Sequence, residues 1–304
     1  MFFERLIRES GIKSERLVNL ANTASKRYYT FEIPKRSGGL RQISHPSKAL
    51  KGIQRWINIR LLRKLPVHSA AMAYRIGISI RDNVIRHTGS RFTLRMDFAD
   101  FFPSFQEAGV RKFLLDQVLA GNCQLEPYDI EFVSKIVLRH GQLTIGAPTS
   151  PMLTNAMMYD FDCSLQRHCD ENAMIYTRYA DDIFISTAEP GLLSTAKAFV
   201  LSVAAQFQYA DLKPNQSKTA FLSRKYRRTI TGLVLTPDDK ISIGRKRKRE
   251  IKALVHKYFG GLLDAEKIAY LKGMLAFISD AEPEFRENLE RKYGLHAITT
   301  ILRD

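Results

Sequence analysis

Cysteine is scarce in this sequence: three of its 304 residues are cysteines, and no two of them form a CxxC pair. An odd number without such a pair argues against a disulfide framework and against a zinc finger. Long apolar runs are also missing, and because Glu4 and Arg5 follow the first three residues at once, we expect no signal peptide. We therefore expect a soluble protein of the reducing cytoplasm, without a membrane partner.

Acidic residues are few beside basic ones, 31 against 47, which gives a formal net charge of +16. The excess is concentrated in two blocks. Residues 26–64 hold eleven Lys and Arg and one acid, and residues 224–257 hold twelve Lys and Arg and three acids. A solvated cationic surface would more often scatter its charge. Two blocks around a slightly acidic middle therefore favour a polyanion lying across the molecule, with carboxylates reserved for chemistry between them.

The length and a hydrophobic content of 45% allow a substantial core shared by two or three subdomains, and no repeat or low-complexity linker divides the chain. Paired glycines at 38 and 39 indicate a basic-tipped hairpin between strands at 28–34 and 40–44. Helical spacing predicts a basic amphipathic helix at 47–64 and an apolar stripe from Ile251 to Leu263. Residue patterns predict strands at 91–98, 174–179 and 183–187.

Three aspartates are candidates for metal binding. Asp181 and Asp182 are adjacent at the tip of the hairpin between the strands at 174–179 and 183–187. Two carboxylates so close together repel each other and raise each other's pKa, and a turn needs only one Asp. An isolated Asp-Asp pair would be read as a solvated turn, but a bound divalent cation would remove the cost of the repulsion. Asp97 leaves the polar face of the strand at 91–98, which can pair beside that hairpin. Together they predict a site for two Mg²⁺ ions about 3.5–4 Å apart.

The residues around these aspartates resemble a known family. Tyr-Ala-Asp-Asp at 179–182, flanked by apolar strands, is similar to the YxDD hairpin of reverse transcriptases, and Asp97 stands in a matching segment at 96–102. The resemblance covers nearly the whole chain and implies an RNA-directed DNA polymerase that uses Mg²⁺ and dNTPs. It implies an α+β right-hand polymerase fold. It assigns fingers with an N-terminal helix and a basic hairpin to 1–90, a palm with an interleaved fingers segment (about 105–150) to 91–235, and a helical, RNA-binding thumb to 236–304.

The resemblance also implies contacts with the incoming dNTP. The hairpin at 33–43 closes over the nucleotide in this family, with Lys35 and Arg41 in the places of phosphate ligands, and a guanidinium can grip a triphosphate in bidentate fashion. Phe102, five positions after Asp97, takes the place of an aromatic residue that rejects a 2′-hydroxyl, which implies DNA synthesis. An exposed hairpin tip and an ordinary phenylalanine core are the simpler alternatives.

Two further elements are implied near the nucleotide. Gly146 and Pro148 lie in a segment that resembles the QGxPxSP element of the family, which backs the nucleotide and template, with Ile145 where glutamine is usual. Isoleucine at this position cannot make the side-chain amide contact of glutamine, but the turn itself is still expected. Lys218, in the next palm element, is implied near the leaving pyrophosphate, and a solvated lysine is the equal alternative.

Two short elements point toward the retron branch of the family. Residues 81–87 resemble the NAxxH element, with Asn83 and His87 in place and Val84 for alanine, and residues 230–232 resemble the VTG element, with Ile230 for valine. In retrons this implies a structured non-coding RNA as template and primer, initiation from a 2′-hydroxyl of a guanosine, and a branched, RNA-linked DNA product. Such systems act in anti-phage defence with an effector protein.

Five consecutive cations open the predicted C-terminal helix, namely Arg245, Lys246, Arg247, Lys248 and Arg249. Five in a row wrap around a helix, so some of them must point away from any one ligand. We interpret the run as phosphate contacts to a stem of the partner RNA, which would be sensitive to salt.

Three alternatives are open at this point. The first is another bacterial reverse transcriptase, of the group II intron-like or abortive-infection type. The second is a non-catalytic RNA-binding scaffold with a polymerase fold, which the presence of all three carboxylates disfavours. The third is an RNA-making polymerase, which Phe102 disfavours. The sequence leaves the oligomeric state open.

Overall fold

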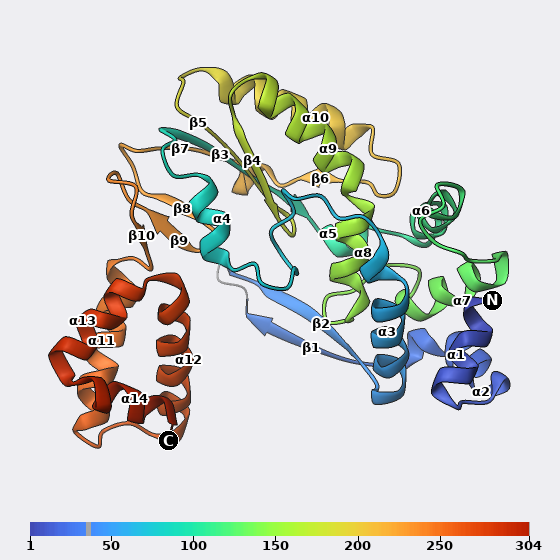
Figure 1. The fold of residues 1–304 in the computed structure, drawn as a ribbon, viewed down its shortest axis with the longest axis horizontal. Coiled ribbons are helices and arrows are strands. Elements are labelled where there is room, and N and C mark those ends of the chain that lie inside the picture. The colour runs from blue at the N-terminus through green and yellow to red at the C-terminus, as the bar shows by residue number, and fades with distance from the viewer. Residues whose placement is uncertain (35–37, 304) are drawn as a thin grey trace.

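The N-terminal part of the protein is a set of helices joined to a long β-hairpin. The computed structural model describes residues 1–34 and 38–303 (Figure 1), so Lys35 of the predicted nucleotide site lies outside the described residues. Strands β1 (Tyr28–Pro34) and β2 (Leu40–Pro46) pair antiparallel, as the glycine pair predicted. The helical segments are α1 (Phe2–Ser10), α2 (Ser14–Asn22), η1 (Ala24–Lys26), α3 (Lys48–Arg60), η2 (Leu62–Lys64) and α4 (Ile80–Arg86).

A five-stranded antiparallel sheet forms the centre of the molecule. Its order is β4–β5–β3–β6, and β7 pairs with β3 as well. The strands are β3 (Phe92–Ala99), β4 (Ile175–Tyr179), β5 (Asp182–Thr187), β6 (Lys213–Pro214) and β7 (Ala220–Ser223). The three longest strands are those that the residue patterns predicted. Leu94 and Ile185, which are paired across β3 and β5, have no exposed surface, so the middle of the sheet is part of the core.

Helices cover this sheet and connect it to the hairpin. They are α5 (Phe101–Ser104), α6 (Glu107–Leu119), α7 (Pro127–Val137), α8 (Thr149–Met157), α9 (Tyr159–Glu171) and α10 (Leu192–Ala205). Helices α9 and α10 pack against the strands, and α3 packs against α7 and α8. One large apolar cluster runs through all of these elements, so the N-terminal helices and the sheet share a single core.

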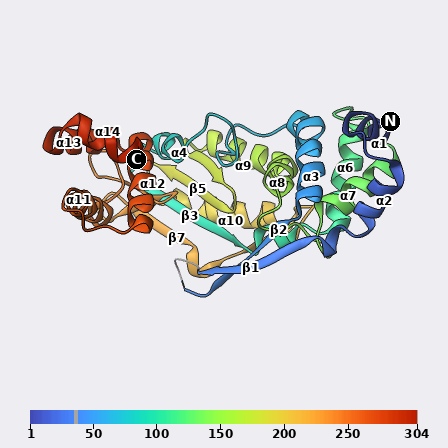
Figure 2. The same ribbon diagram turned by 90° about the horizontal axis from the view of Figure 1, so that it is seen from below.

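The C-terminal part has an apolar cluster of its own. The three-stranded sheet of β8 (Arg228–Ile230), β9 (Leu233–Leu235) and β10 (Ile241–Ser242) leads into α11 (Arg245–Phe259), α12 (Ala265–Ala281), α13 (Pro283–Tyr293) and α14 (Leu295–Arg303), here called the C-terminal bundle. Val84 of α4 and Phe184 of β5 belong to this cluster and join the bundle to the central sheet. The bundle lies at the opposite end of the molecule from α1 and α2 (Figures 1 and 2). In the described ranges, no helix combines the length and apolar content needed to cross a membrane.

The apolar stripe predicted from Ile251 to Leu263 ends earlier than expected. Ile251 and Val255 are buried, but α11 stops at Phe259 and Leu262 is 73% exposed. Gly261, just past the helix, has φ 66°, a left-handed conformation that suits glycine and turns the chain away. The turn leaves Leu262 in solvent, while Leu263 packs, partly buried, against the apolar cluster of the C-terminal part.

Candidate active site

Asp97 and Asp182 lie directly opposite each other on two neighbouring strands of the central sheet. The antiparallel register of β3 and β5 pairs these two residues directly. Side chains directly opposite in such a pair lie on the same face, with Cβ atoms about 4.5–5.5 Å apart. Asp181 precedes Asp182 in the turn between β4 and β5, where Ala180 has a left-handed backbone with φ 58°. The structure therefore brings together the three aspartates from two distant stretches of sequence.

These carboxylates lie close enough to repel one another. Asp97 is only 4% exposed. Burial, followed by the charges of Asp181 and Asp97, raises the pKa of Asp182 to about 7. Burial and the charge of Asp97 also raise the pKa of Asp181. Carboxylates perturbed in this way are stabilised by a cation placed among them.

Lys218 supplies the nearest positive charge. It ends the short turn η3 (Gln216–Lys218), and its Nζ lies 2.8 Å from Oδ2 of Asp97. The positive charges of Arg95 and Lys218 lower the pKa of Asp182. Burial and repulsion by the neighbouring carboxylates raise it by more. The sequence placed Lys218 near the leaving pyrophosphate. In the structure it is an ion-pair partner of Asp97, inside the group of predicted site residues.

The donor set fits a hard divalent cation, although the side chains do not form a ready-made cage. Within residues 1–34 and 38–303, no group of three or more His, Cys, Asp or Glu is arranged to hold a metal ion. The donors at this site are carboxylate oxygens, the ligands that Mg²⁺ prefers. Oδ1 of Asp97 is buried and has no hydrogen-bond partner in the described structure, so one oxygen is available for an ion. Asp97, Asp181 and Asp182 are the residues that would hold it.

A buried ion pair supports the turn that carries Asp181. Arg178, with no exposed surface, donates from Nε and Nη2 to the two oxygens of Asp162 at 2.8 and 2.6 Å. Its Nη1 donates to the carbonyl oxygen of Ala180 at 3.1 Å and to Oδ1 of Asn155 at 3.2 Å. Arg178 thus fixes the backbone just before Asp181. Sequence reasoning missed this role, and the available signal was a charged residue inside an otherwise apolar strand.

Tyr74 lies within electrostatic range of both the hairpin and Asp181. Its backbone is left-handed (φ 61°), which is rare for a bulky residue and marks a constrained position. Burial, followed by the charge of Asp181, raises the pKa of Tyr74 to about 12, and Arg41 of β2 acts in the opposite direction. Arg41 is therefore within electrostatic reach of the site. The ring of Tyr74 lies 6.5 Å, centroid to centroid, from the half-buried ring of Phe102. No sequence pattern pointed to Tyr74.

The turn at Gly146 packs directly against the hairpin. Gly146 has φ 109°, and a Cβ there would lie 2.7 Å from the carbonyl oxygen of Ser44 in β2, so only glycine fits. The backbone N–H of Ser44 donates to the carbonyl of Ile145 at 2.8 Å, and Nδ2 of Asn58 donates to the carbonyl of Pro148 at 2.9 Å. Ile145, which replaces the usual glutamine, contributes its backbone. The turn thus holds β2 in place next to the site.

Comparison with known proteins assigns the family. Residues 33–258 match the sequence profile of the family described as reverse transcriptase (RNA-dependent DNA polymerase). The retron Ec83 reverse transcriptase of Escherichia coli is 34% identical, over 93% of this chain and 92% of the relative. The retron Ec86 reverse transcriptase of the same organism is 31% identical, over 93% and 88%. The chain belongs to the retron-type reverse transcriptases.

The reverse transcriptase is thus an RNA-directed DNA polymerase, and membership of this family implies the use of dNTPs and a divalent metal ion. The solved foamy viral protease-reverse transcriptase in complex with ds DNA aligns with a TM-score of 0.50 and 14% identity, over 91% of this chain and 43% of that chain. At this identity the likeness concerns the fold alone. The predicted α+β right-hand polymerase fold is confirmed.

The two residues of the NAxxH-like element do not reach the surface of the reverse transcriptase. Asn83 and His87 have no exposed surface. Nε2 of His87 lies 2.7 Å from Oγ1 of Thr177 in β4, and burial, with smaller effects of Arg228 and Arg86, lowers its pKa to about 3. A buried side chain cannot touch RNA, so the expectation of direct RNA contact is corrected for both residues. His87, the residue just after α4, thus ties this helix to the central sheet, and Asn83 is buried within α4.

The five cations at the start of α11 divide into two groups. Nη1 of Arg247 donates to the carbonyl of Gly232 at 3.1 Å, and its guanidinium lies over the ring of Phe277. Lys248 forms an ion pair with Glu282. These two contacts hold the side chains of Arg247 and Lys248 against the protein, and RNA binding by these two residues stays a prediction. Three cations are exposed and have no ion-pair partner in the described chain: Arg245, Lys246 and Arg249.

Proposed function

We propose that this reverse transcriptase copies a dedicated structured non-coding RNA into a branched, RNA-linked single-stranded DNA, using two Mg²⁺ ions. The proposal is carried by the placement of Asp97 opposite Asp182 and next to Asp181 in one largely buried group. Bound at these carboxylates, the ions would activate the primer hydroxyl and neutralise the triphosphate. The proposed setting is anti-phage defence in the cytoplasm with an effector protein, and the three free cysteines are compatible with a reducing compartment.

The remaining site residues act on the nucleotide in this proposal. Arg41, exposed on β2, binds the triphosphate through its guanidinium fork. Phe102 crowds the 2′-position of the sugar, and Lys218 stands near the leaving pyrophosphate. Gly146 and Pro148 back the nucleotide from the turn that holds β2. The support for these roles is position: each of the five residues lies on an element adjacent to the aspartates or to the hairpin.

We also propose the division of labour along the chain. Residues 1–90 act as fingers, residues 91–235 as the palm with the interleaved segment at about 105–150, and residues 236–304 as the thumb. The support for a thumb is that the helices after Gly244 pack around an apolar cluster other than the large one of the N-terminal helices, although Val84 and Phe184 from the rest of the chain also belong to it. In this thumb Arg245, Lys246 and Arg249 bind phosphates of an RNA stem.

Replacing Phe102 by alanine is expected to relax sugar discrimination. The substitution removes the apolar ring that crowds the 2′-hydroxyl, and a hydrophobic contact of this size changes selectivity by roughly ten- to a hundredfold. The measurement is the ratio of the kcat/KM values for rNTP and dNTP incorporation. Phe221→Ala, at a half-exposed phenylalanine of β7, is the control and keeps the wild-type ratio. An unchanged ratio in the Phe102 variant would refute the gate assignment.

The nucleic acid that co-purifies with the protein tests the retron function. We expect an RNA–DNA hybrid in which the two strands are joined by a 2′,5′ linkage, recognised by a mobility shift after treatment with debranching enzyme and by sequencing across the junction. The Asp181→Asn protein should carry the RNA without DNA. Linear DNA without a branch would favour a group II intron-like or abortive-infection enzyme and overturn the proposed product.

A further inference from the structure

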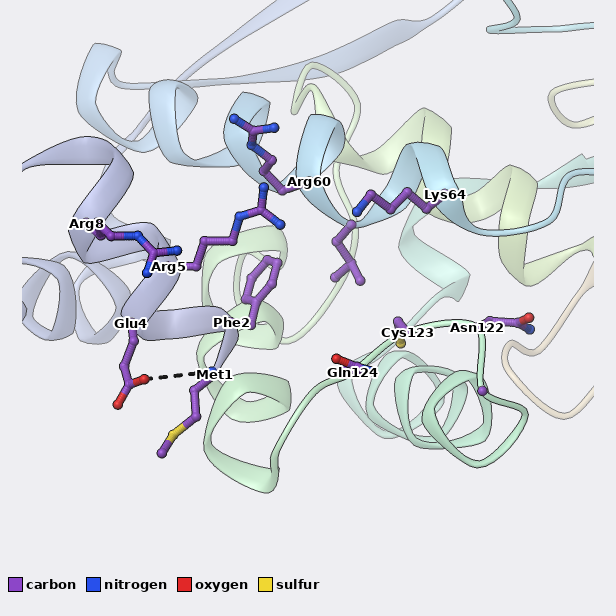
Figure 3. A pocket seen from close by; sticks show the side chains of 12 residues that line it. Met1, Phe2, Glu4, Arg5, Arg8, Arg60, Lys64, Asn122, Cys123 and Gln124 are labelled. Atoms are coloured by element: carbon purple, nitrogen blue, oxygen red, sulfur yellow. Dashed lines mark ion pairs between the residues drawn. The ribbon is translucent and has the colours of Figure 1, made fainter.

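A cationic pocket lies at the end of the molecule opposite the C-terminal bundle. Its cavity measures about 520 Å³. Arg5 and Arg8 come from α1, Arg60 from the end of α3 and Lys64 from η2, and Figure 3 shows these side chains around the cavity. Glu4 is the one acid among the lining residues, and it pairs with the N-terminal ammonium group of the described chain. The proposed active site uses none of these residues.

Glu9 holds two of the arginines in a fixed arrangement. Nε of Arg5 donates to one of its oxygens at 2.7 Å, and Nε of Arg60 donates to the other at 2.8 Å. Trp56 adds a third donor through Nε1, at 2.8 Å. The hydrogen bond from Arg5, with further donation from Trp56 and Arg60, lowers the pKa of Glu9 to about 2, so the carboxylate stays charged. Two guanidinium groups are therefore oriented before any ligand arrives.

The terminal nitrogens of Arg5 and Arg60 are available to bind a ligand. Arg5 and Arg60 contact Glu9 only through Nε, and their terminal Nη nitrogens make no hydrogen bond with the described chain. Arg8 and Lys64 are exposed and have no ion-pair partner in the described residues. A guanidinium with both terminal nitrogens free binds phosphate in bidentate fashion, and prior orientation lowers the entropy lost on binding.

We propose that this pocket binds the phosphodiester backbone of a nucleic-acid strand, as a second anchor remote from the active site. A carboxylate of an acidic protein could also pair with arginine, but this chain is an RNA-directed DNA polymerase, so a phosphate strand is already held on the same molecule. Arg60 and Lys64 also belong to the first of the two basic blocks, which a strand crossing the protein would follow. The proposal rests on the family activity and on none of the proposed roles at the aspartates.

The test removes two cations that have no partner within the protein. Arg8→Gln with Lys64→Gln is the pocket variant. Lys13→Gln with Arg16→Gln is the control, because these two exposed residues, at the N-cap and in the first turn of α2, lie outside the pocket and carry the same charge. Binding of labelled oligouridine and of oligodeoxythymidine of equal length is measured by fluorescence anisotropy across a salt series. Two lost phosphate contacts lower the slope of log K against log salt by about 1.4 for a single strand. The strand type that loses affinity identifies the ligand as RNA or DNA.

Two further measurements make the outcome specific. Oligouridine carrying 4-thiouridine is expected to photo-cross-link to peptides from residues 1–10 or 121–124 in the wild type and not in the pocket variant. Extension of a short hairpin template-primer should be the same in both variants and the wild type, which separates this proposal from the assignment of the active site. Equal salt slopes in the pocket and control variants would overturn the proposal. Loss of polyglutamate binding, with strand binding unchanged, would overturn it in favour of an acidic protein partner.

Discussion

Replacing Asp181 by asparagine is expected to abolish DNA synthesis by this reverse transcriptase and to leave its RNA binding nearly intact. Asparagine keeps the shape of the side chain but removes the negative charge that a divalent ion requires. Ion-assisted charge stabilisation contributes several kcal/mol to such a reaction, so we expect a loss of roughly a thousandfold or more in kcat. Primer extension with labelled dNTPs measures the loss, and a filter-binding assay measures the retained RNA.

The same substitution should not harm the fold. Asp181 lies among like charges and its pKa is raised by burial and by Asp97, so a neutral residue relieves repulsion. We expect the Tm to stay the same or to rise. Asp280→Asn, at an exposed aspartate of α12, is the matched control and should be fully active. If Asp181→Asn synthesises DNA at the rate of that control, the three aspartates are not the catalytic centre.

Replacing Asp162 by leucine is expected to destabilise the protein by about 3–5 kcal/mol. Asp162 and Arg178 have no exposed surface, so the substitution leaves a buried guanidinium without its counter-charge. Tyr176 also loses the acceptor of its hydroxyl, which lies 2.7 Å from Oδ1 of Asp162. Urea-induced unfolding measures the change in the free energy of unfolding.

A double substitution shows whether the unpaired charge is the cause. With Arg178→Met added to Asp162→Leu, both charges are absent, and most of the lost stability should return, because an apolar pair of similar volume replaces an ion pair at little cost. DNA synthesis by the double variant should be lower than that of the wild type, since the carbonyl of Ala180 has lost the donor that fixes it beside Asp181. A double variant no more stable than the single one would show that shape, and not charge, makes this pair important.

Local residue patterns predicted the strands and the turn that carry the site residues. They could not predict which residues pair between strands that are distant in sequence. Alternation placed Asp97 on a strand, and the apolar flanks placed Asp181 and Asp182 at a hairpin tip. The residue patterns suggested only that the strand of Asp97 could pair beside that hairpin; the register that sets Asp97 opposite Asp182 comes from the structure, because no local pattern fixes the pairing of strands so distant in sequence. The ion-pair partner of Arg178 could not be predicted for the same reason. A charge inside a strand indicates that a buried partner exists, but the sequence does not show which residue it is.

Short motifs were a weaker guide to exposure. The NAxxH-like element led to an expectation of RNA contact, yet the face of α4 that carries Asn83 and His87 is the one that packs inward. The basic run of α11 was predicted to divide between ligand and other faces. Which of these cations contact the protein depends on Gly232 and Glu282, which lie in other elements of the C-terminal part. Identity within a motif does not determine the direction of a side chain.

The apolar cluster that joins the C-terminal bundle to the central sheet has a mechanical consequence. Phe184 belongs to that cluster and stands two residues after Asp182 on the same strand. Close packing resists deformation, so a displacement of the bundle is expected to be felt at the strand that carries Asp182. If the bundle binds RNA as proposed, a substitution in this cluster should therefore alter both RNA affinity and the rate of DNA synthesis.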